Sequence, residues 1–204
     1  GAVAVVPGRV HTGAFDLFRQ NNEFHYLCGV EVPQAYLTIM ATTGETVLYL
    51  PHRDEKMERS EGVSLNCDRA EHVSAVTGIP AVRSYSDMAG DLANIHVIYA
   101  PLQEGEGKQM CRDTLAHGRH TRELDPWDRG ETREQRFLNQ LKDNGGVREV
   151  NDLVPLLDEM RGCKEESELH LMRVAGRVTA EAVCQAMRST RVGGWEYELA
   201  AVAE

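Results

Sequence analysis

Residues 35–50 of this 204-residue chain read AYLTIMATTGETVLYL and contain the clearest strand signal in the sequence. Two runs rich in β-branched and aromatic residues, 35–41 and 46–50, flank the connection Thr42-Thr-Gly-Glu45. A short connection that contains glycine is typical of a β-hairpin. Pro51 ends the second run, because proline has no backbone N–H for a strand ladder. The sequence therefore predicts an antiparallel strand pair.

Strand and helix patterns alternate on both sides of this hairpin. Three more strands are predicted, at residues 2–6, 82–85 and 95–99. Five short helices are predicted, at residues 23–28, 68–77, 86–92, 132–142 and 151–160. Asp68 and Ser86 are the expected N-caps of two of them. The alternation predicts an α/β domain with a mixed β-sheet flanked by helices.

Residues 103–130 carry the least regular pattern, and we expect a long loop there with one helix near 108–116. Residues 165–188, in contrast, carry the strongest helical pattern in the chain. Their apolar stripe is formed by Leu171, Ala175, Val178, Ala182 and Ala186. This spacing predicts one continuous long helix that leads out of the domain.

The two ends of the sequence also carry information. The chain opens on Gly1 and runs directly into an apolar strand, and it closes at Glu204 inside a second helical pattern that starts at Trp195. No glycine, asparagine or proline marks a helix end there. We therefore interpret the chain as a segment of a longer protein.

Charge and composition exclude several classes of protein. The sequence has 22 Lys and Arg against 32 Asp and Glu, a net charge of −10, which argues against a nucleic-acid binder. No apolar run approaches the roughly 20 residues of a membrane helix, and no signal-peptide pattern opens the chain. Five widely spaced cysteines without a CxxC pair indicate free thiols and a cytoplasmic protein.

Motifs for metal or nucleophilic chemistry are weak. His117 and His120 form the one close histidine pair, but Gly118 between them predicts an exposed loop rather than a metal site. HExxH, GxSxG and SxxK motifs are absent, and no sequence signal singles out a reactive cysteine. Gly145-Gly146 is typical of a helix end rather than of a phosphate-binding loop. From its residues alone the chain is a non-catalytic α/β domain.

Two stretches resemble a known family. Phe18-Arg-Gln-Asn-Asn-Glu-Phe-His-Tyr-Leu-Cys-Gly29, followed by Glu31-Val-Pro-Gln-Ala35, is similar to the FRQ-x-x-x-F-x-YL-x-G signature of the aminopeptidase P N-terminal domain. Leu50-Pro-His-Arg-Asp54 resembles the P-x-R-D turn of that domain. Residues 160–173 and 194–199 resemble the linker helix and the opening of the catalytic domain that follow it in the family.

The resemblance implies a division of the chain into two parts. Residues 1–160 would be the aminopeptidase P N-terminal, non-catalytic domain. Residues 161–204 would be the linker and the first helices of a pita-bread catalytic domain. One departure is that Glu165-Glu166 replace the Ser-Pro that often follows the linker lysine, so the helix cap must differ.

The activity that the resemblance implies is that of a metallopeptidase which removes an N-terminal residue ahead of proline. Such enzymes hold two metal ions, usually manganese, with two Asp, one His and two Glu of the catalytic domain. In the family all five ligands lie after the region that matches this chain. The resemblance therefore assigns no catalytic and no metal residue here, and we expect this segment alone to be inactive.

The N-terminal domain in such enzymes caps the active-site cleft and takes part in homo-oligomer contacts. Arg19 and Gln20 of the signature are therefore candidates for a substrate-binding or interface role. The alternative, which we favour, is that Phe18, Phe24 and Tyr26 pack in the core while Arg19 and Gln20 hydrogen-bond to nearby backbone.

The sequence is also compatible with two other functions. The chain could belong to a catalytically inactive peptide- or protein-binding module of the same superfamily. It could also belong to a prolidase or amidinohydrolase relative, because that distinction lies in the catalytic domain.

Overall fold

The computed structural model describes residues 1–10, 17–108, 110–128 and 130–203. The chain divides into two compact units, Gly1–Leu157 and Asp158–Glu204. The predicted division into residues 1–160 and 161–204 stays a prediction, and so does the assignment of the second part to a pita-bread domain.

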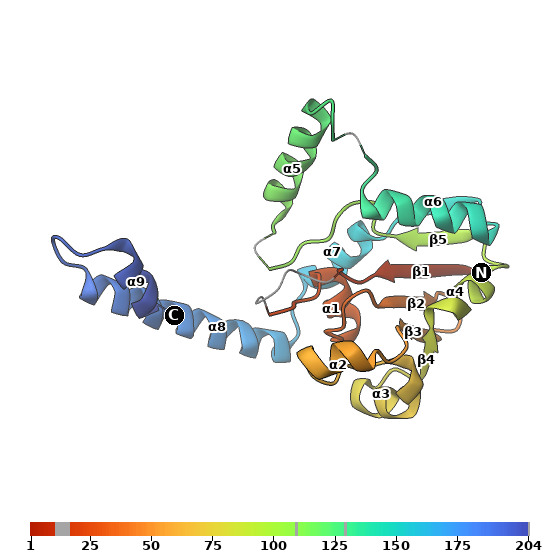
Figure 1. Cartoon of the computed structure of the whole chain (residues 1–204), viewed down its shortest axis with the longest axis horizontal. Coiled ribbons are helices and arrows are strands. Elements are labelled where there is room, and N and C mark those ends of the chain that lie inside the picture. Colours follow the sequence, from red (N-terminus) through yellow and green to blue (C-terminus); the bar gives the residue numbers. More distant parts are fainter. Residues whose placement is uncertain (11–16, 109, 129, 204) are drawn as a thin grey trace. The chain divides into compact units, whose positions relative to one another are not determined.

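The first unit is built on a six-stranded mixed sheet (Figure 1). Its strands are β1 (Ala2–Pro7), β2 (Tyr36–Met40), β3 (Thr46–Leu50), β4 (Ala81–Ser84), β5 (Val97–Ala100) and β6 (Glu149–Asp152). They lie in the order β4-β3-β2-β1-β5-β6. β2 is antiparallel to both of its neighbours, and all other pairs are parallel. The carboxyl ends of the five parallel strands therefore share one side of the sheet, called here the carboxyl edge.

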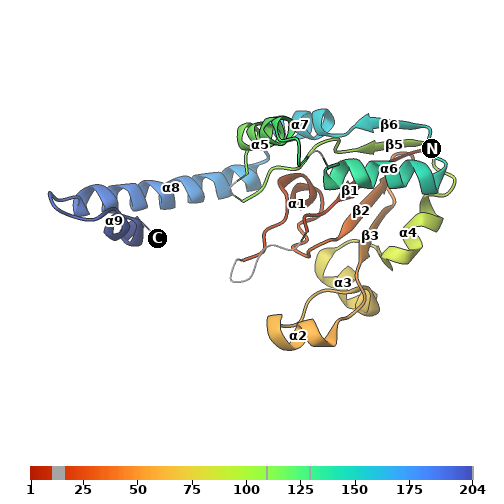
Figure 2. The same cartoon turned by 45° about the horizontal axis from the view of Figure 1, so that its top comes forward.

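Helices cover both faces of this sheet, as predicted (Figure 2). One core contains Phe24 of α1 (Asn22–Cys28), Val73 of α3 (Ala70–Thr77) and Leu157 of α7 (Val154–Gly162), all packed against β1–β3. The other core joins α4 (Tyr85–Leu92) and α6 (Arg133–Gly145) to β1 and β5. Alternation of the β1 side chains between the two cores explains the layering, since successive residues of a strand face opposite sides.

Several predicted elements are confirmed. The β2–β3 hairpin pairs Leu37 with Leu48, and both side chains are buried. Gly29 and Gly78 end α1 and α3 in the left-handed conformation, with φ of 66° and 75°. Glycine adopts that conformation without the steric cost that a Cβ would bring.

Other predictions are wrong in detail. Asp68 is not the N-cap of the helix after it, because the 3₁₀ turn Cys67–Arg69 precedes α3. Ser84 rather than Ser86 caps α4, in a capping box with Asp87. Asn151 and Asp152, expected at a helix start, belong to β6, since they extend the sheet beside β5.

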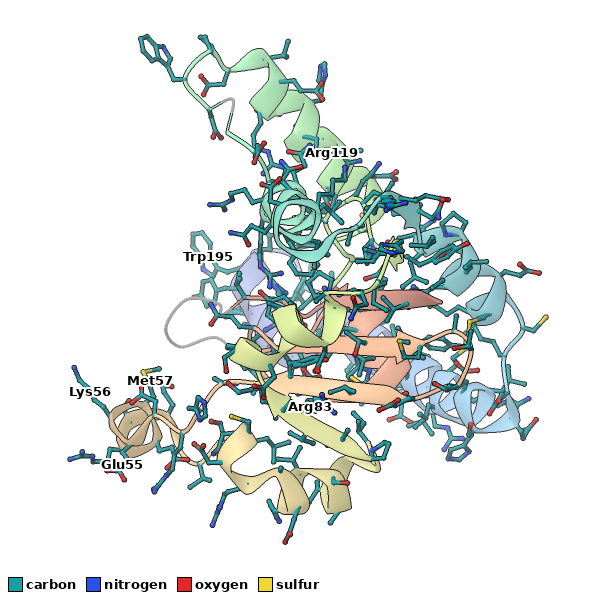
Figure 3. All side chains as sticks on the ribbon, turned by 90° about the vertical axis from the view of Figure 1, so that its right-hand side faces the viewer. Glu55, Lys56, Met57, Arg83, Arg119 and Trp195 are labelled. Atoms are coloured by element: carbon teal, nitrogen blue, oxygen red, sulfur yellow. The ribbon has the colours of Figure 1, made fainter. Side chains whose placement is uncertain are left out.

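The predicted helix near 108–116 is longer and starts later, as α5 (Arg112–Leu124). Gly118 lies inside it, so His117 and His120 are on a helix and not in the expected loop. α2 (Glu55–Glu61) has no buried residue, and Figure 3 shows Glu55, Lys56 and Met57 around its exposed surface.

The second unit contains α8 (Glu166–Ser189) and α9 (Glu196–Ala203). α8 is continuous through Gly176, as the pattern predicted. Large apolar side chains remain exposed on it, Leu171 at 67% and Val178 at 61%. No helix in the described part of the chain is both long and apolar enough to span a membrane.

Candidate functional site

Gln20, the first of the two candidate residues, is buried at 3% exposure between the end of β1 and the segment before β2. Its Oε1 accepts hydrogen bonds from the backbone N–H groups of Arg9 and Asn21. Its Nε2 donates to the carbonyl oxygen of Val32 at 3.0 Å. One amide thus connects three backbone segments at the carboxyl edge, which agrees with the structural role that we favoured.

Arg19, the second candidate, points outward. Its side chain is 54% exposed and lies 3.4 Å from the carboxylate of Glu31. The other oxygen of Glu31 accepts from the backbone N–H of Gln20 at 2.7 Å, so the acceptor for Arg19 is held in place. An exposed guanidinium on a fixed segment is available to a ligand or a neighbouring subunit, and this role stays a prediction.

The aromatic residues of the same signature separate into two groups. Phe24 is fully buried in the core, as expected, and Phe18 is half-buried. Tyr26 was expected in the core, but it is 37% exposed, because α1 has only two buried residues, Glu23 and Phe24.

A polar recess of about 320 Å³ lies at the carboxyl edge beside α1 and α5. Two guanidiniums line it, those of Arg112 and Arg119, together with the carboxylates of Glu23, Glu104, Glu106, Asp113 and Asp152. The backbone N–H of Asn22 donates to the Glu106 carbonyl at 2.8 Å, which joins the wall of this recess to the signature segment. Mixed charges of this kind suit a polar ligand with both an amine and a carboxylate or carbonyl.

Gly105 fixes how closely this wall approaches α1. A Cβ at Gly105 would lie 2.7 Å from Glu23 Oε2 and 3.1 Å from the Asn21 side chain. The absence of a side chain at Gly105 therefore permits this close approach of backbone to helix.

A second group of polar side chains lies where β3 and β4 end. His52 Nδ1 is 2.7 Å from Asp68 Oδ1 and 3.4 Å from Cys67 Sγ. His52 Nε2 is 3.1 Å from Ser84 Oγ. The hydrogen bond from the Arg53 backbone N–H, with that from His52, holds the pKa of Asp68 below its usual value. We call His52, Cys67 and Asp68 the His52 cluster.

The order Ser84–His52–Asp68 is also that of a hydrolytic triad. Ser84 is poorly suited to be a nucleophile, because its Oγ already accepts from the Ser86 hydroxyl at 3.1 Å and caps α4. His52 is 68% exposed as well, so water surrounds the base. The arrangement therefore favours metal binding over acyl transfer.

A third feature is an aromatic pocket of about 360 Å³ between α4 and α6. The Tyr36 ring meets Tyr85 edge to face at 5.7 Å and stacks on Phe137 at 5.3 Å. Arg133 lies 5.9 Å over the Tyr36 ring, a cation–π contact. The Tyr85 hydroxyl is buried without a hydrogen-bond partner in the described part of the chain, and burial raises its pKa. The pocket suits an apolar group that also accepts a hydrogen bond.

Neither the His52 cluster nor the aromatic pocket was found by sequence reasoning. Cys67 and Asp68 are adjacent but follow His52 by 15 and 16 positions, a spacing that matches no ligand motif. The P-x-R-D turn that contains His52 is the one sequence signal near this cluster, and it indicates the family resemblance rather than a metal site.

The manganese ions that the resemblance implies do not fit the described residues. The one group of three or more potential ligands in the described ranges is the His52 cluster. A thiol and an imidazole with one carboxylate differ from the hard set of two Asp, one His and two Glu. No step of a manganese mechanism is therefore assigned to this chain.

Comparison with known proteins shows what this chain is similar to. Residues 4–99 match the family model described as aminopeptidase P, N-terminal domain. The chain is 28% identical to the Xaa-Pro aminopeptidase of Haemophilus influenzae over 185 residues, which are 89% of this chain and 36% of the relative. It is 27% identical to the human Xaa-Pro dipeptidase over 212 residues, with 100% of this chain and 38% of the relative covered. The chain thus spans little more than a third of these relatives.

Solved structures show the same fold. Aminopeptidase PepP of Pseudomonas aeruginosa matches with a TM-score of 0.70 and 21% identity, over 99% of this chain and 43% of that one. An Escherichia coli aminopeptidase P structure matches with a TM-score of 0.70 and 23% identity, over 99% and 44%.

The fold and its carboxyl edge define a class, an α/β domain with a mixed six-stranded sheet between two helical layers. Within that class, residues 4–99 of this chain match the aminopeptidase P N-terminal domain.

Proposed function

We propose that this chain is the non-catalytic N-terminal domain, with the linker, of a cytoplasmic Xaa-Pro aminopeptidase. The observation that carries the proposal is the family match over residues 4–99, together with Xaa-Pro aminopeptidases among the relatives. The enzyme as a whole would remove the N-terminal residue that precedes proline. Two manganese ions in its catalytic domain would supply the water activation.

In this proposal the domain caps the active site and contributes to homo-oligomer contacts. The support is the construction of its carboxyl edge, where buried Gln20 holds the segment that presents exposed Arg19. A guanidinium held in this way can bind the carboxylate or a carbonyl of a peptide. The net charge of −10 supports a peptide rather than a nucleic acid as the partner.

A prolidase is the second candidate, and the match of the whole chain to the human Xaa-Pro dipeptidase favours it over the remaining alternatives. An amidinohydrolase or a catalytically inactive peptide-binding module would share the same N-terminal domain. These candidates differ in their substrates, so one panel of assays separates them.

The test begins with the gene that encodes this chain. We expect codons for two Asp, one His and two Glu at pita-bread spacing beyond Glu204, and manganese-dependent cleavage of Xaa-Pro peptides by the encoded protein. Cleavage of Xaa-Pro dipeptides alone would favour the prolidase. Replacement of the ligands, with peptide binding retained, would favour the inactive module.

The role of Arg19 is tested in that same protein. Arg19→Ala should raise KM or weaken the oligomer without unfolding the domain. Arg136→Ala, at an exposed position on α6, is the matched control. Equal kinetics and equal oligomeric state for the two variants would remove Arg19 from the proposal. The 204-residue chain with added manganese should not cleave a Gly-Pro peptide.

A further inference from the structure

The His52 cluster brings together three different ligand atoms. His52 Nδ1, Cys67 Sγ and a carboxylate oxygen of Asp68 all lie within 4.8 Å of one another. The cluster is at the carboxyl edge of the sheet, because His52 follows β3 and β3 pairs in parallel with β4. Binding sites of open α/β sheets commonly lie at this edge.

The surrounding contacts hold each ligand in position. Ser84 Oγ lies 3.1 Å from His52 Nε2 and can accept a hydrogen bond from an Nε2–H group, which leaves the Nδ1 lone pair for a metal. Arg53 donates its backbone N–H to Asp68 Oδ2 at 2.7 Å, which leaves Oδ1 facing His52. Cys67 donates its backbone N–H to the Pro51 carbonyl at 3.0 Å. Partners of this kind orient ligands in metal sites.

We propose that His52, Cys67 and Asp68 bind one Zn²⁺ ion. Imidazole nitrogen, thiolate and carboxylate are the three ligand types of zinc, whereas manganese prefers oxygen. His52 and Asp68 are exposed to solvent, so water takes the fourth position. Binding breaks the His52–Asp68 hydrogen bond, moves the ring proton to Nε2 and releases one proton, from the Cys67 thiol.

This site is separate from the proposed peptidase function. It uses residues of this chain alone, and its test needs no catalytic domain. Failure of zinc binding would leave the family assignment intact, and absence of peptidase activity would leave the zinc site intact.

The experiment titrates the metal-free, reduced 204-residue chain with Co²⁺ and then with Zn²⁺. We expect one Co²⁺ per chain, a sulfur-to-cobalt charge-transfer band in the near ultraviolet, and loss of that band when Zn²⁺ displaces the cobalt. Cys67→Ser should abolish the band, and His52→Ala should weaken binding strongly. Ser84→Ala should weaken it about 10-fold, as expected for a group that orients a ligand.

Matched controls address one other exposed cysteine and the histidine pair on α5. Cys111→Ser removes an exposed thiol, and the double variant His117→Ala/His120→Ala removes the i,i+3 pair on α5. Both should retain the band and the stoichiometry. Circular dichroism checks that each variant is folded. If Cys67→Ser does not fold, His52→Ala decides, because His52 is exposed and outside the core.

Three results would overturn the proposal. The first is the absence of saturable binding at millimolar Co²⁺. The second is a charge-transfer band that survives Cys67→Ser. The third is loss of the band in the His117→Ala/His120→Ala variant, which would place the metal on α5.

Discussion

Gln20 Nε2 donates a hydrogen bond to the Val32 carbonyl at 3.0 Å, although 12 positions separate the two residues. The same amide accepts from the backbone N–H of Arg9, so it joins the segments that enter and leave the signature helix α1. With Gln20 only 3% exposed, water cannot replace these bonds. This one side chain therefore organises the carboxyl edge beside β1.

Gln20→Leu should destabilise the folded chain by about 1–3 kcal/mol, because it leaves buried backbone groups without partners. Urea unfolding measures the change. Arg19→Leu, at the neighbouring exposed position, should change the free energy of unfolding by about 0.5 kcal/mol or less. Equal effects for the two substitutions would contradict the structural role of Gln20.

Gly8→Ala should destabilise the chain by about 1–3 kcal/mol through overpacking. A Cβ there would lie 2.8 Å from the Ala35 carbonyl oxygen, and backbone cannot move aside as a flexible side chain can. Gly90→Ala is the control, since open space surrounds that glycine within α4. It should stabilise the chain by up to about 1 kcal/mol through helix propensity. Thermal unfolding of the two variants tests the expected loss of stability for Gly8→Ala and the expected gain for Gly90→Ala.

The cysteines should differ in their rates of alkylation. Hydrogen bonds from Thr114, its backbone N–H first, lower the pKa of Cys111, and this thiol is exposed. Burial raises the pKa of Cys28 to about 11. Because the thiolate is the reactive form, iodoacetamide at neutral pH should modify Cys111 faster than Cys28. Mass spectrometry of peptides over time measures the order, and preferential modification of Cys28 would contradict it.

Alkaline pH should destabilise the fold through Tyr49. Burial, and then the hydrogen bond from its hydroxyl to Asp91 at 2.8 Å, raise the pKa of Tyr49 from 10.0 to about 12. The folded state therefore favours the protonated phenol. Its contribution is complete below pH 10 and is lost as the pH rises through about 12. Urea unfolding across this range should show a smaller pH dependence for Tyr49→Phe than for the unsubstituted chain.

The exposed apolar face of α8 should make the 204-residue chain self-associate at high concentration. Leu171 and Val178 lie on one side of the helix, two turns apart, and both are more than half exposed. The double variant Leu171→Gln/Val178→Gln should have a molar mass by light scattering closer to that of the monomer. Glu181→Gln is a control that keeps the apolar face. A strict monomer in the unsubstituted chain would contradict this prediction.

Local elements were predictable where neighbouring residues carry the signal. The β2–β3 hairpin and α8 follow from side-chain periodicity within one continuous segment. The end of α1 at Gly29 follows from the preference of glycine for positive φ. The family signature also predicted the fold class, because it combines buried apolar residues with turn residues at fixed spacing.

β6 could not be predicted in this way. Its four residues, Glu149–Asp152, include no fully buried side chain, and their strand conformation depends on hydrogen bonds to β5. α5 was shortened in the prediction because Gly118 suggested a loop, whereas glycine inside a helix costs only about 1 kcal/mol.

What the sequence determined about this protein is its strongly patterned local elements, such as the β2–β3 hairpin and α8, its acidic charge and its family resemblance, since local patterns and composition do not depend on tertiary contacts. Tertiary structure alone decided that Gln20 is buried while Arg19 is exposed. It also decided that His52, Cys67 and Ser84 meet, because the parallel pairing of β3 with β4 brings their carboxyl ends to one edge. Contacts between residues distant in sequence depend on strand order and burial, and no short motif encodes these.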